Sequence, residues 1–396
     1  MIYNISDRMK DLQPSAIREI FKFLSDPTII SFAAGNPAPE AFPIDIVRQI
    51  SAEIFSEEPV NALQYSLTEG YPPLRALLKN MLATDNRFNA ERDELIITAG
   101  AQQVMDLTAK VLTNEGDTVI TENPSFIGSL NTFRSYRLNL RGIDMDDEGI
   151  DIAAFEQAIK EKKPAFVYLI PNFQNPTGNT TSLKRRKEIL NVASKYEVII
   201  LEDNPYGDLR FDGEHIPSLK ELDTEGRVIY AGTFSKTLAP GLRVGFMSAP
   251  NDIVQKAVVA LQTSTVHTNI WAQLLTYRFL GKVDYITHCK NLSQIYKKKC
   301  NLMLSELDKQ VSREIVFTKP QGGLFLWGSL PHGDMNAFCL EAVKNKVALV
   351  PGTAFLADEK GSTLSFRLNY STPTDEQIIN GVKLLGDTAK QLGYGY

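Results

Sequence analysis

Cysteine is scarce in this sequence. The 396 residues include three cysteines, Cys289, Cys300 and Cys339, and no two of them form a C-x-x-C pair. Such a small, odd number excludes a disulfide-stapled mini-protein and is typical of reduced thiols in the cytoplasm.

Long hydrophobic runs and excess positive charge are missing as well. The longest apolar stretches, such as residues 165–170, have the length of a strand and fall far short of a bilayer span. The first twenty residues carry several charges and no apolar stretch, so no export signal is expected. The net charge of −5 gives nucleic acid or an anionic membrane no electrostatic basis for binding. We therefore expect a cytoplasmic protein with neither kind of partner.

Several familiar motifs are also absent. The chain contains no G-x-G-x-x-G, Walker A lysine loop, G-x-S-x-G elbow or H-E-x-x-H. The histidines, His215, His267, His288 and His332, are far apart in the sequence, so no metal site is expected. The chemistry must be carried by other residues.

Strands and helices alternate through the middle of the chain. The whole chain of 396 residues is too long for one small core. Its composition of 43% hydrophobic and 22% charged residues is that of a globular protein. β-branched runs predict strands, and 3.6-residue periodicity predicts helices. The predicted strands span 95–98, 118–121, 165–170, 198–202 and 227–231, and the predicted helices span 101–112 and 183–196. This order indicates an α/β fold with a mostly parallel, doubly wound sheet.

The pattern changes near residue 284. A long amphipathic helix is followed by a predicted strand at 323–327, a helix at 336–346, a strand at 365–368 and a helix at 375–392. This order indicates a compact α+β unit. We predict an N-terminal arm over 1–40, a large domain over 41–285 and a small domain over 286–396, with the arm joining the small domain.

Polar residues follow three consecutive predicted strands. Asn175 follows the strand at 165–170, Asp203 and Tyr206 follow that at 198–202, and Lys236 follows that at 227–231. Ligands of open parallel sheets bind beyond the carboxyl ends of the strands, so these side chains are expected to converge there. Pyridoxal 5′-phosphate requires an amine that forms an imine and a carboxylate that keeps the ring nitrogen protonated.

A phosphate and a ring would need further partners. Arg243, with the hydroxyls of Ser235 and Thr233, could bind the phosphate. So could the start of the helix at Gly100-Ala101-Gln102, because free N–H groups at a helix N-terminus attract anions. Phe126 could stack on the pyridine ring. Each residue alone has an ordinary structural interpretation, such as a turn or a solvated surface charge, and the shared order and placement carry the inference.

Taken together, these motifs make the chain resemble fold-type I pyridoxal-phosphate aminotransferases of class I/II over nearly its full length. The matching segments are Asn175-Pro-Thr-Gly178, Asp203-x-x-Tyr206, Ser235-Lys236, Gly241-Leu-Arg-Val-Gly245 and Ser365-Phe-Arg-Leu368. The kynurenine/2-aminoadipate aminotransferase branch is the most similar. Its features appear in Pro14-Ser-Ala-Ile-Arg18, Phe32-Ala-Ala-Gly-Asn-Pro37, Leu63-Gln-Tyr-Ser66 and Gly322-Gly-Leu-Phe-Leu-Trp327.

The resemblance implies roles for the cofactor-binding residues. Lys236 would hold the cofactor as an imine and then shuttle a proton. Asp203 would pair with the ring nitrogen, and Tyr206 and Asn175 would hydrogen-bond the phenolate oxygen. Two positions depart from the usual pattern: Ala101 stands where serine is common, and Phe126 where tyrosine is common.

It also implies substrate contacts and an assembly. Arg367 would clamp the α-carboxylate, and Gly35 would let the backbone approach the substrate. Tyr65 would reach the phosphate of a neighbouring subunit, which implies a homodimer with shared sites. Arg18, on the N-terminal arm, would contact a distal carboxylate or else pair with local acids.

Transamination is the function expected from this resemblance. An amino acid such as 2-aminoadipate, kynurenine or an aromatic amino acid would pass its amino group to 2-oxoglutarate by a ping-pong mechanism. One alternative keeps the cofactor and breaks a different bond, as a C–S β-lyase. Another is the aminotransferase-like effector domain of a transcription regulator. Such regulators carry a DNA-binding module before this domain, whereas Gly35 is reached here after a short arm.

Overall fold

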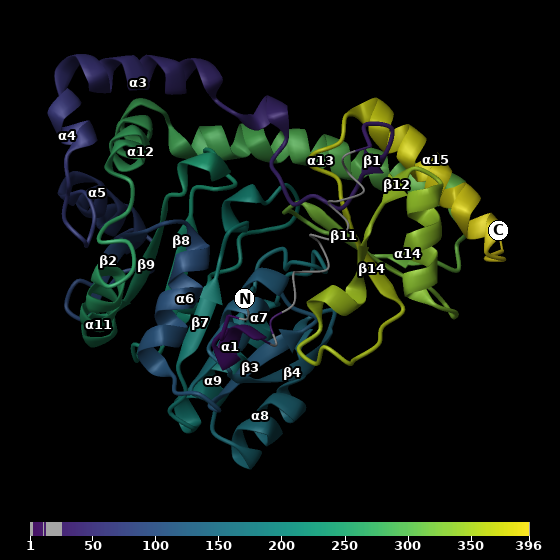
Figure 1. The fold of residues 1–396 in the computed structure, drawn as a ribbon, viewed down its shortest axis with the longest axis horizontal. Helices are drawn as coiled ribbons and strands as arrows, with labels where there is room; N and C mark the ends of the chain where they lie inside the picture. Colours follow the sequence, from purple (N-terminus) through teal and green to yellow (C-terminus); the bar gives the residue numbers. More distant parts are fainter. Residues whose placement is uncertain (1–2, 11, 13–25, 396) are drawn as a thin grey trace.

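An eight-stranded sheet forms the centre of the large α/β part of the computed structural model, which describes residues 3–10, 12 and 26–395 (Figure 1). The strand order is β2-β9-β8-β7-β6-β3-β4-β5. The bounds are β2 (Asp93–Thr98), β3 (Thr118–Asn123), β4 (Asn139–Asp146), β5 (Gly149–Ile150), β6 (Phe166–Leu169), β7 (Ile200–Asp203), β8 (Val228–Thr233) and β9 (Gly245–Pro250). Among all the described residues, no helix combines the length and apolar character needed to cross a membrane.

Most neighbouring strands in this sheet are parallel. β8, β7, β6, β3 and β4 run in one direction, while β9 lies antiparallel between β2 and β8. Alternate residues of one strand enter different cores: Phe166 and Tyr168 pack on one face of the sheet, and Val167 and Leu169 on the other. The α/β fold with a mostly parallel, doubly wound sheet, predicted from the sequence, is confirmed.

Helices cover both faces of the sheet. α6 (Ala101–Leu112), α7 (Ile127–Ser135) and α11 (Asn251–Gln262) pack on the Tyr168 face, and α8 (Ile152–Glu161) and α9 (Leu183–Lys195) on the other. A third cluster joins the β2 end of the sheet to α3 (Ile44–Glu57), α4 (Pro59–Leu63), α5 (Pro72–Ala83) and α12 (Ile270–Lys282). Side-chain caps fix several starts: Asp151 accepts from the amide of Ala154 in α8, and Ser182 accepts from that of Arg185 in α9.

The C-terminal part forms a separate hydrophobic core around a four-stranded sheet of order β10-β11-β14-β13. Its strands are β10 (Val316–Phe317), β11 (Phe325–Ser329), β13 (Val350–Pro351) and β14 (Ser365–Asn369), flanked by α13 (Tyr285–Gln310), α14 (Met335–Lys344) and α15 (Asp375–Gln391). β1 (Ile30–Ser31) pairs with β12 (Val347–Ala348), so the segment after residue 26 adds to this unit. The short elements are α1 (Asp7–Lys10), α10 (Leu219–Leu222), η1 (Pro39–Ala41), η2 (Gly207–Leu209), η3 (Pro240–Leu242) and η4 (Gly352–Phe355).

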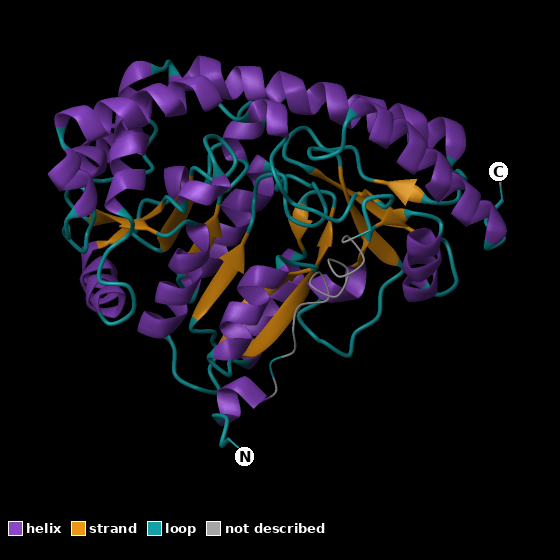
Figure 2. Cartoon of the chain, turned by 45° about the horizontal axis from the view of Figure 1, so that its top comes forward, coloured by secondary structure: helices purple, strands orange, loops and turns teal. Residues whose placement is uncertain are grey.

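α13 links the two parts of the molecule. It follows α12 and runs across to α15, as two views show (Figure 1, Figure 2). At its start, the Tyr285 hydroxyl donates to Asp208 and hydrogen-bonds the Thr237 hydroxyl in the large part, while Met303 and Leu307 lie in the core of the small part. The domain boundaries at residues 40 and 285 remain a prediction.

Candidate active site

The carboxyl ends of β6, β7 and β8 open into one cavity. These strands are adjacent and parallel, so the residues that follow them meet at one edge of the sheet. The cavity encloses about 280 Å³. It is lined by Ala33, Gly35, Asn36, Ala101, Gln102, Met105, Phe126, Ser129, Ile170, Asn175, Asp203, Pro205, Tyr206, Thr233, Ser235, Lys236, Pro240, Arg243, Phe325 and Arg367.

Lys236 extends into this cavity from the loop after β8. Its Nζ donates to the carbonyl oxygen of Gly35 at 2.8 Å, which fixes the amine between the two parts of the molecule. Burial, with the nearby cations Arg367 and Arg243, lowers the pKa of Lys236 to about 8. The amine is therefore available in its neutral form far closer to neutral pH than an exposed lysine is.

Asp203 lies at the end of β7 and is buried. Its Oδ2 accepts a hydrogen bond from the Tyr168 hydroxyl at 2.8 Å, whereas its Oδ1 is buried without a hydrogen-bond partner among the described residues. Burial raises the pKa of Asp203 to about 7. Glu202 faces the other way and accepts from the amides of Leu219 and Lys220, as strand alternation requires.

Arg367 enters the cavity from β14, opposite Lys236. Its two terminal nitrogens donate to Asn175 Oδ1 at 2.8 Å and to the Ala33 carbonyl at 2.7 Å, while Nε is buried and unpartnered among the described residues. The guanidinium lies over the rings of Phe325 and Phe355, at 4.3 and 5.0 Å. Burial lowers the pKa of Arg367 to about 10.

Tyr206 closes the same side of the cavity. Its hydroxyl hydrogen-bonds Asn175, and its ring meets Phe325 edge-on at 5.8 Å. Burial raises the pKa of this phenol above its usual range. Asn175 and Tyr206 thus present an amide and a neutral phenol side by side.

The opposite end of the cavity is built for an anion. Arg243 adopts a left-handed backbone conformation (φ 52°) and donates to Ser235 Oγ at 3.4 Å and to the Ala99 carbonyl at 2.9 Å. Gly100, before the first residue of α6, has φ 76°, and a Cβ there would lie 2.7 Å from the Arg243 guanidinium. Gly100 is the N-cap residue of α6 and has no side chain with which to cap the helix. The first amides of the helix are therefore available to a phosphate.

The remaining predicted cofactor residues surround this end. Thr233 Oγ1 donates to Ser235 Oγ at 3.0 Å, and Phe126 and Ala101 line the wall. The Gln102 amide donates to the Gly128 carbonyl and to Thr132 Oγ1, so it ties α6 to α7.

Two predicted site residues lie elsewhere. Tyr65 is 82% exposed, packs edge-on against His267 at 5.8 Å and does not line the cavity of its own chain. Its contact with a neighbouring subunit stays a prediction. Arg18, with the segment Pro14–Arg18, lies outside the described residues.

Sequence reasoning missed the residues that support the reactive groups. Tyr168 and Ser129 hydrogen-bond toward Asp203, and Phe355 packs on Arg367. A phenol within the apolar run 165–170 was the available signal for Tyr168. Nothing comparable marked Ser129 or Phe355, because their placement depends on packing between distant segments.

The site fits pyridoxal 5′-phosphate. Asp203 Oδ1 is an orphaned buried acceptor suited to a ring N–H, and the Gly100–Arg243 cradle suits a phosphate. Lys236 supplies an amine that lines the same cavity. Fold and site together define a pyridoxal-phosphate enzyme of fold type I.

Comparison with known proteins narrows this class. Residues 27–385 match the family model "Aminotransferase class I and II". The 2-aminoadipate transaminase of Thermus thermophilus is 39% identical over 96% of this chain and 95% of its own length. The aromatic-amino-acid aminotransferase 1 of Thermococcus litoralis is 38% identical over 98% of this chain and 94% of its own. The chain belongs to the class I and II aminotransferases and is a pyridoxal-phosphate-dependent transaminase.

A solved structure agrees closely with this fold. The kynurenine aminotransferase of Pyrococcus horikoshii superposes with a TM-score of 0.95 at 37% identity, covering 99% of this chain and 98% of that one. The expected family, fold and cofactor are therefore confirmed.

Proposed function

We propose that this transaminase moves the amino group of an aromatic, kynurenine-type or 2-aminoadipate-type amino acid to 2-oxoglutarate, in two half-reactions at one site. The single observation that carries the site assignment is the cavity shared by Lys236, Arg367 and the unpartnered Oδ1 of Asp203. The amine would carry the proton, the guanidinium would bind the carboxylate of the amino acid, and the carboxylate oxygen would accept from the N–H of the pyridine ring.

Pyridoxal 5′-phosphate, when bound, supplies the carbonyl carbon and the electron-accepting ring that make loss of a Cα proton possible. Asp203 Oδ1 would accept from the protonated ring nitrogen and keep it cationic. Asn175 and Tyr206 would hydrogen-bond the ring oxygen. Arg243, Ser235, Thr233 and the first amides of α6 at Gly100–Gln102 would hold the phosphate.

Lys236 would act as the proton carrier. A lysine is a base only when its amine is neutral, and burial beside Arg367 and Arg243 lowers its pKa to about 8. Arg367 would hold the substrate α-carboxylate by two parallel hydrogen bonds, which would orient the substrate for proton transfer to Lys236. Both half-reactions use the same proton path in opposite directions.

Substrate class is inferred from relatives and from the chemistry of the cavity. Relatives carry the names aromatic-amino-acid aminotransferase, 2-aminoadipate transaminase and kynurenine aminotransferase. Among the described lining residues, the cations are Lys236, Arg243 and Arg367, all assigned above. Arg18, the arm residue named from the sequence, would bind a distal carboxylate, whereas an aromatic side chain would pack on Phe126 and Phe325.

The test is a panel of amino donors assayed with 2-oxoglutarate. We expect kynurenine, aromatic amino acids and 2-aminoadipate to be turned over only when the oxo acid is present. Arg18→Ala should lower kcat/KM for 2-aminoadipate and leave that for kynurenine unchanged. Release of pyruvate from cystathionine without an oxo acid would instead indicate a β-lyase.

The assembly and its setting are part of the proposal. A homodimer with shared sites would bring Tyr65 of one chain to the phosphate of the other. Three free cysteines, all buried, favour a reducing compartment, the cytoplasm.

A further inference from the structure

A buried phenol holds Asp203 from behind, and the mechanism above does not use it. Tyr168 Oη donates to Asp203 Oδ2 at 2.8 Å, and Ser129 Oγ donates to Tyr168 Oη at 2.8 Å. Neither Tyr168 nor Ser129 has exposed surface, and the Tyr168 ring packs edge-on against Phe133 at 5.4 Å. A chain of hydrogen bonds therefore runs from α7 through β6 to the carboxylate.

The two oxygens of this carboxylate have different surroundings. Oδ2 is occupied by Tyr168, while Oδ1 is buried with no partner in the described part of the chain. A single fixed donor on one oxygen sets the rotation of the carboxylate and leaves the other oxygen for an incoming N–H. We propose that Tyr168, supported by Ser129, is a positioning residue that aims Asp203 Oδ1 at the ring nitrogen of the cofactor. The inference rests on the role proposed above for Asp203.

The same hydrogen bond bears on the charge of Asp203. Burial raises the pKa of this carboxyl, the Tyr168 hydrogen bond lowers it, and the charge of Glu202 raises it. Two further titratable groups interact with Asp203, Glu122 on β3 and Tyr206 after β7. Without the phenol, Asp203 is therefore expected to take up a proton at higher pH and to pair less well with a cationic ring.

Tyr168→Phe tests this directly, because it removes one oxygen and keeps the ring in place. The apo form of each variant is titrated with pyridoxal 5′-phosphate, and the absorption of the bound cofactor is followed against pH. We expect Tyr168→Phe to raise the Kd about tenfold and to move the acid-side spectral transition to higher pH. Ser129→Ala should move both quantities in the same direction by less.

Tyr136→Phe is the matched control. The Tyr136 hydroxyl also donates to an aspartate, Asp106, at 2.8 Å, but Asp106, unlike Asp203, does not line the cavity. Its loss should change neither the Kd nor the spectral transition. If Tyr168→Phe and Tyr136→Phe weakened cofactor binding equally, a general packing effect would explain the result and the proposal would be overturned.

Asp203→Ala separates the two levels of inference. If Asp203→Ala binds the cofactor as tightly as the wild type, the role of Asp203 is wrong and the role of Tyr168 falls with it. If Asp203→Ala weakens binding while Tyr168→Phe keeps the wild-type Kd and spectrum, only the positioning role is wrong. Should Tyr168→Phe fail to fold, unchanged binding and spectrum in Ser129→Ala would overturn the proposal.

Discussion

Arg367 is a residue of the cavity for which we expect even a conservative substitution to impair function. Its guanidinium is fully buried, already donates to Asn175 and Ala33, and lies between Phe325 and Phe355. A lysine at this position would keep the charge but lose the planar fork and the stacking. We expect Arg367→Lys to lower kcat/KM for every amino donor about 100-fold, or about 2.7 kcal/mol, through KM more than through kcat.

Steady-state kinetics with two donors of different side chains would measure this effect. Arg48→Lys serves as control, because Arg48 pairs with Asp45 on the exposed face of α3. The cofactor spectrum should be unchanged in both variants. An unchanged KM in Arg367→Lys would show that another group binds the α-carboxylate.

Lys236 should titrate well below an ordinary lysine in the protein without cofactor. Burial lowers its pKa from 10.5 to about 8, so the amine is half neutral near pH 8 and mostly protonated at pH 6. Acetic anhydride attacks only neutral amines. We expect acylation of Lys236, followed by mass spectrometry of its peptide, to rise with pH and level off above about pH 9, one unit beyond its pKa.

Lys298 is the internal reference for this experiment. It is exposed and pairs with Asp375, which raises its pKa, so its acylation should still be increasing at pH 10. Parallel profiles for the two lysines would contradict the lowered pKa of Lys236.

The reactive side chains were predictable from the sequence because each follows a recognisable strand. Lys236, Asp203 and Asn175 leave adjacent parallel strands, so chain order alone brings them together. Tyr168 and Phe355 were not predicted. The phenol within an apolar strand marks Tyr168 but does not say which group it contacts, and Phe355 comes from the small part of the molecule.

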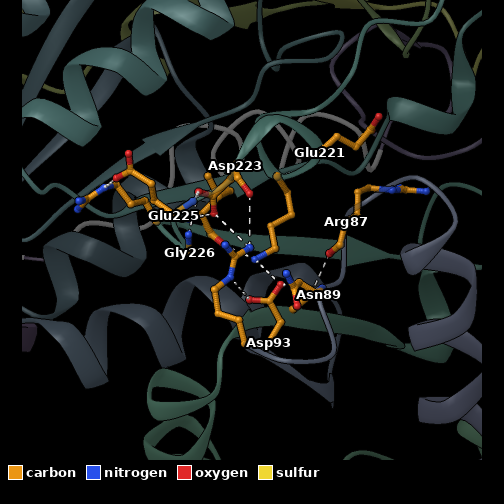
Figure 3. Close-up of polar contacts among 12 residues, drawn as sticks. Arg87, Asn89, Asp93, Glu221, Asp223, Glu225 and Gly226 are labelled. Carbon is orange, nitrogen blue, oxygen red and sulfur yellow. Dashed lines mark hydrogen bonds and ion pairs between the residues drawn. The ribbon is translucent and has the colours of Figure 1, made fainter.

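At the scale of elements, a buried ion pair fixes the start of β2 to α10. Lys220 Nζ lies 2.9 Å from Asp93 Oδ2, and both side chains have no exposed surface. Asp93 and Asp223 belong to one cluster of polar contacts (Figure 3). Arg92 forms ion pairs with both carboxylates, at 3.2 and 3.8 Å. Lys220 Nζ also donates to the carbonyl of Val228, the first residue of β8, at 2.9 Å, so the cluster joins β2 to β8, the two strands on either side of β9.

Lys220→Met should destabilise the protein by about 3 kcal/mol, since it leaves the Asp93 carboxylate buried with weaker compensation from Arg92. Urea unfolding of the cofactor-free protein would measure the change. Lys195→Met breaks an exposed pair with Glu156 and should leave the unfolding midpoint unchanged. Equal midpoints for the two variants would mean that the buried pair adds nothing to stability.

Elements were predicted well where local pattern and tertiary packing agree. The helix predicted at 101–112 is α6, and that at 183–196 ends one residue early as α9. β9 was missed, because Gly-Phe-Met-Ser-Ala-Pro has little intrinsic strand preference and is held by β2 and β8 on either side. The strand predicted at 323–327 is observed at Phe325–Ser329, because Gly323 has φ 74° and packs on Phe173.

At the scale of the whole molecule, hydrogen bonds join the small part to the large part beside the cavity. The Ser125 amide donates to the Phe355 carbonyl at 2.8 Å, and Arg134 donates to the carbonyls of Leu356 and Ala357 at 2.9 and 3.1 Å. Phe355 packs in turn on Arg367. The position of Arg367 is thereby coupled to the arrangement of the two parts.

An exposed apolar surface on α4 and the loop after it favours pairing with a second copy. Val60, Leu63 and Tyr65 are 72%, 76% and 82% exposed. We expect light scattering to give twice the chain mass of 44.2 kDa. Leu63→Asp should produce monomers with weaker cofactor binding, whereas Leu340→Asp, at an exposed leucine of α14, should leave the dimer intact.

Mixing equal amounts of two variants with defective sites tests whether the sites are shared. Lys236→Ala lacks the amine and Tyr65→Ala lacks the phenol, so homodimers of either variant have two defective sites. In a mixed dimer with shared sites, the Tyr65→Ala chain keeps its own Lys236 and receives Tyr65 from its partner, which makes one site complete. After exchange of subunits, about a quarter of all sites should regain wild-type affinity for pyridoxal 5′-phosphate. If Tyr65 served its own chain, both defects would stay separate and no mixture would bind better than the Tyr65→Ala protein alone.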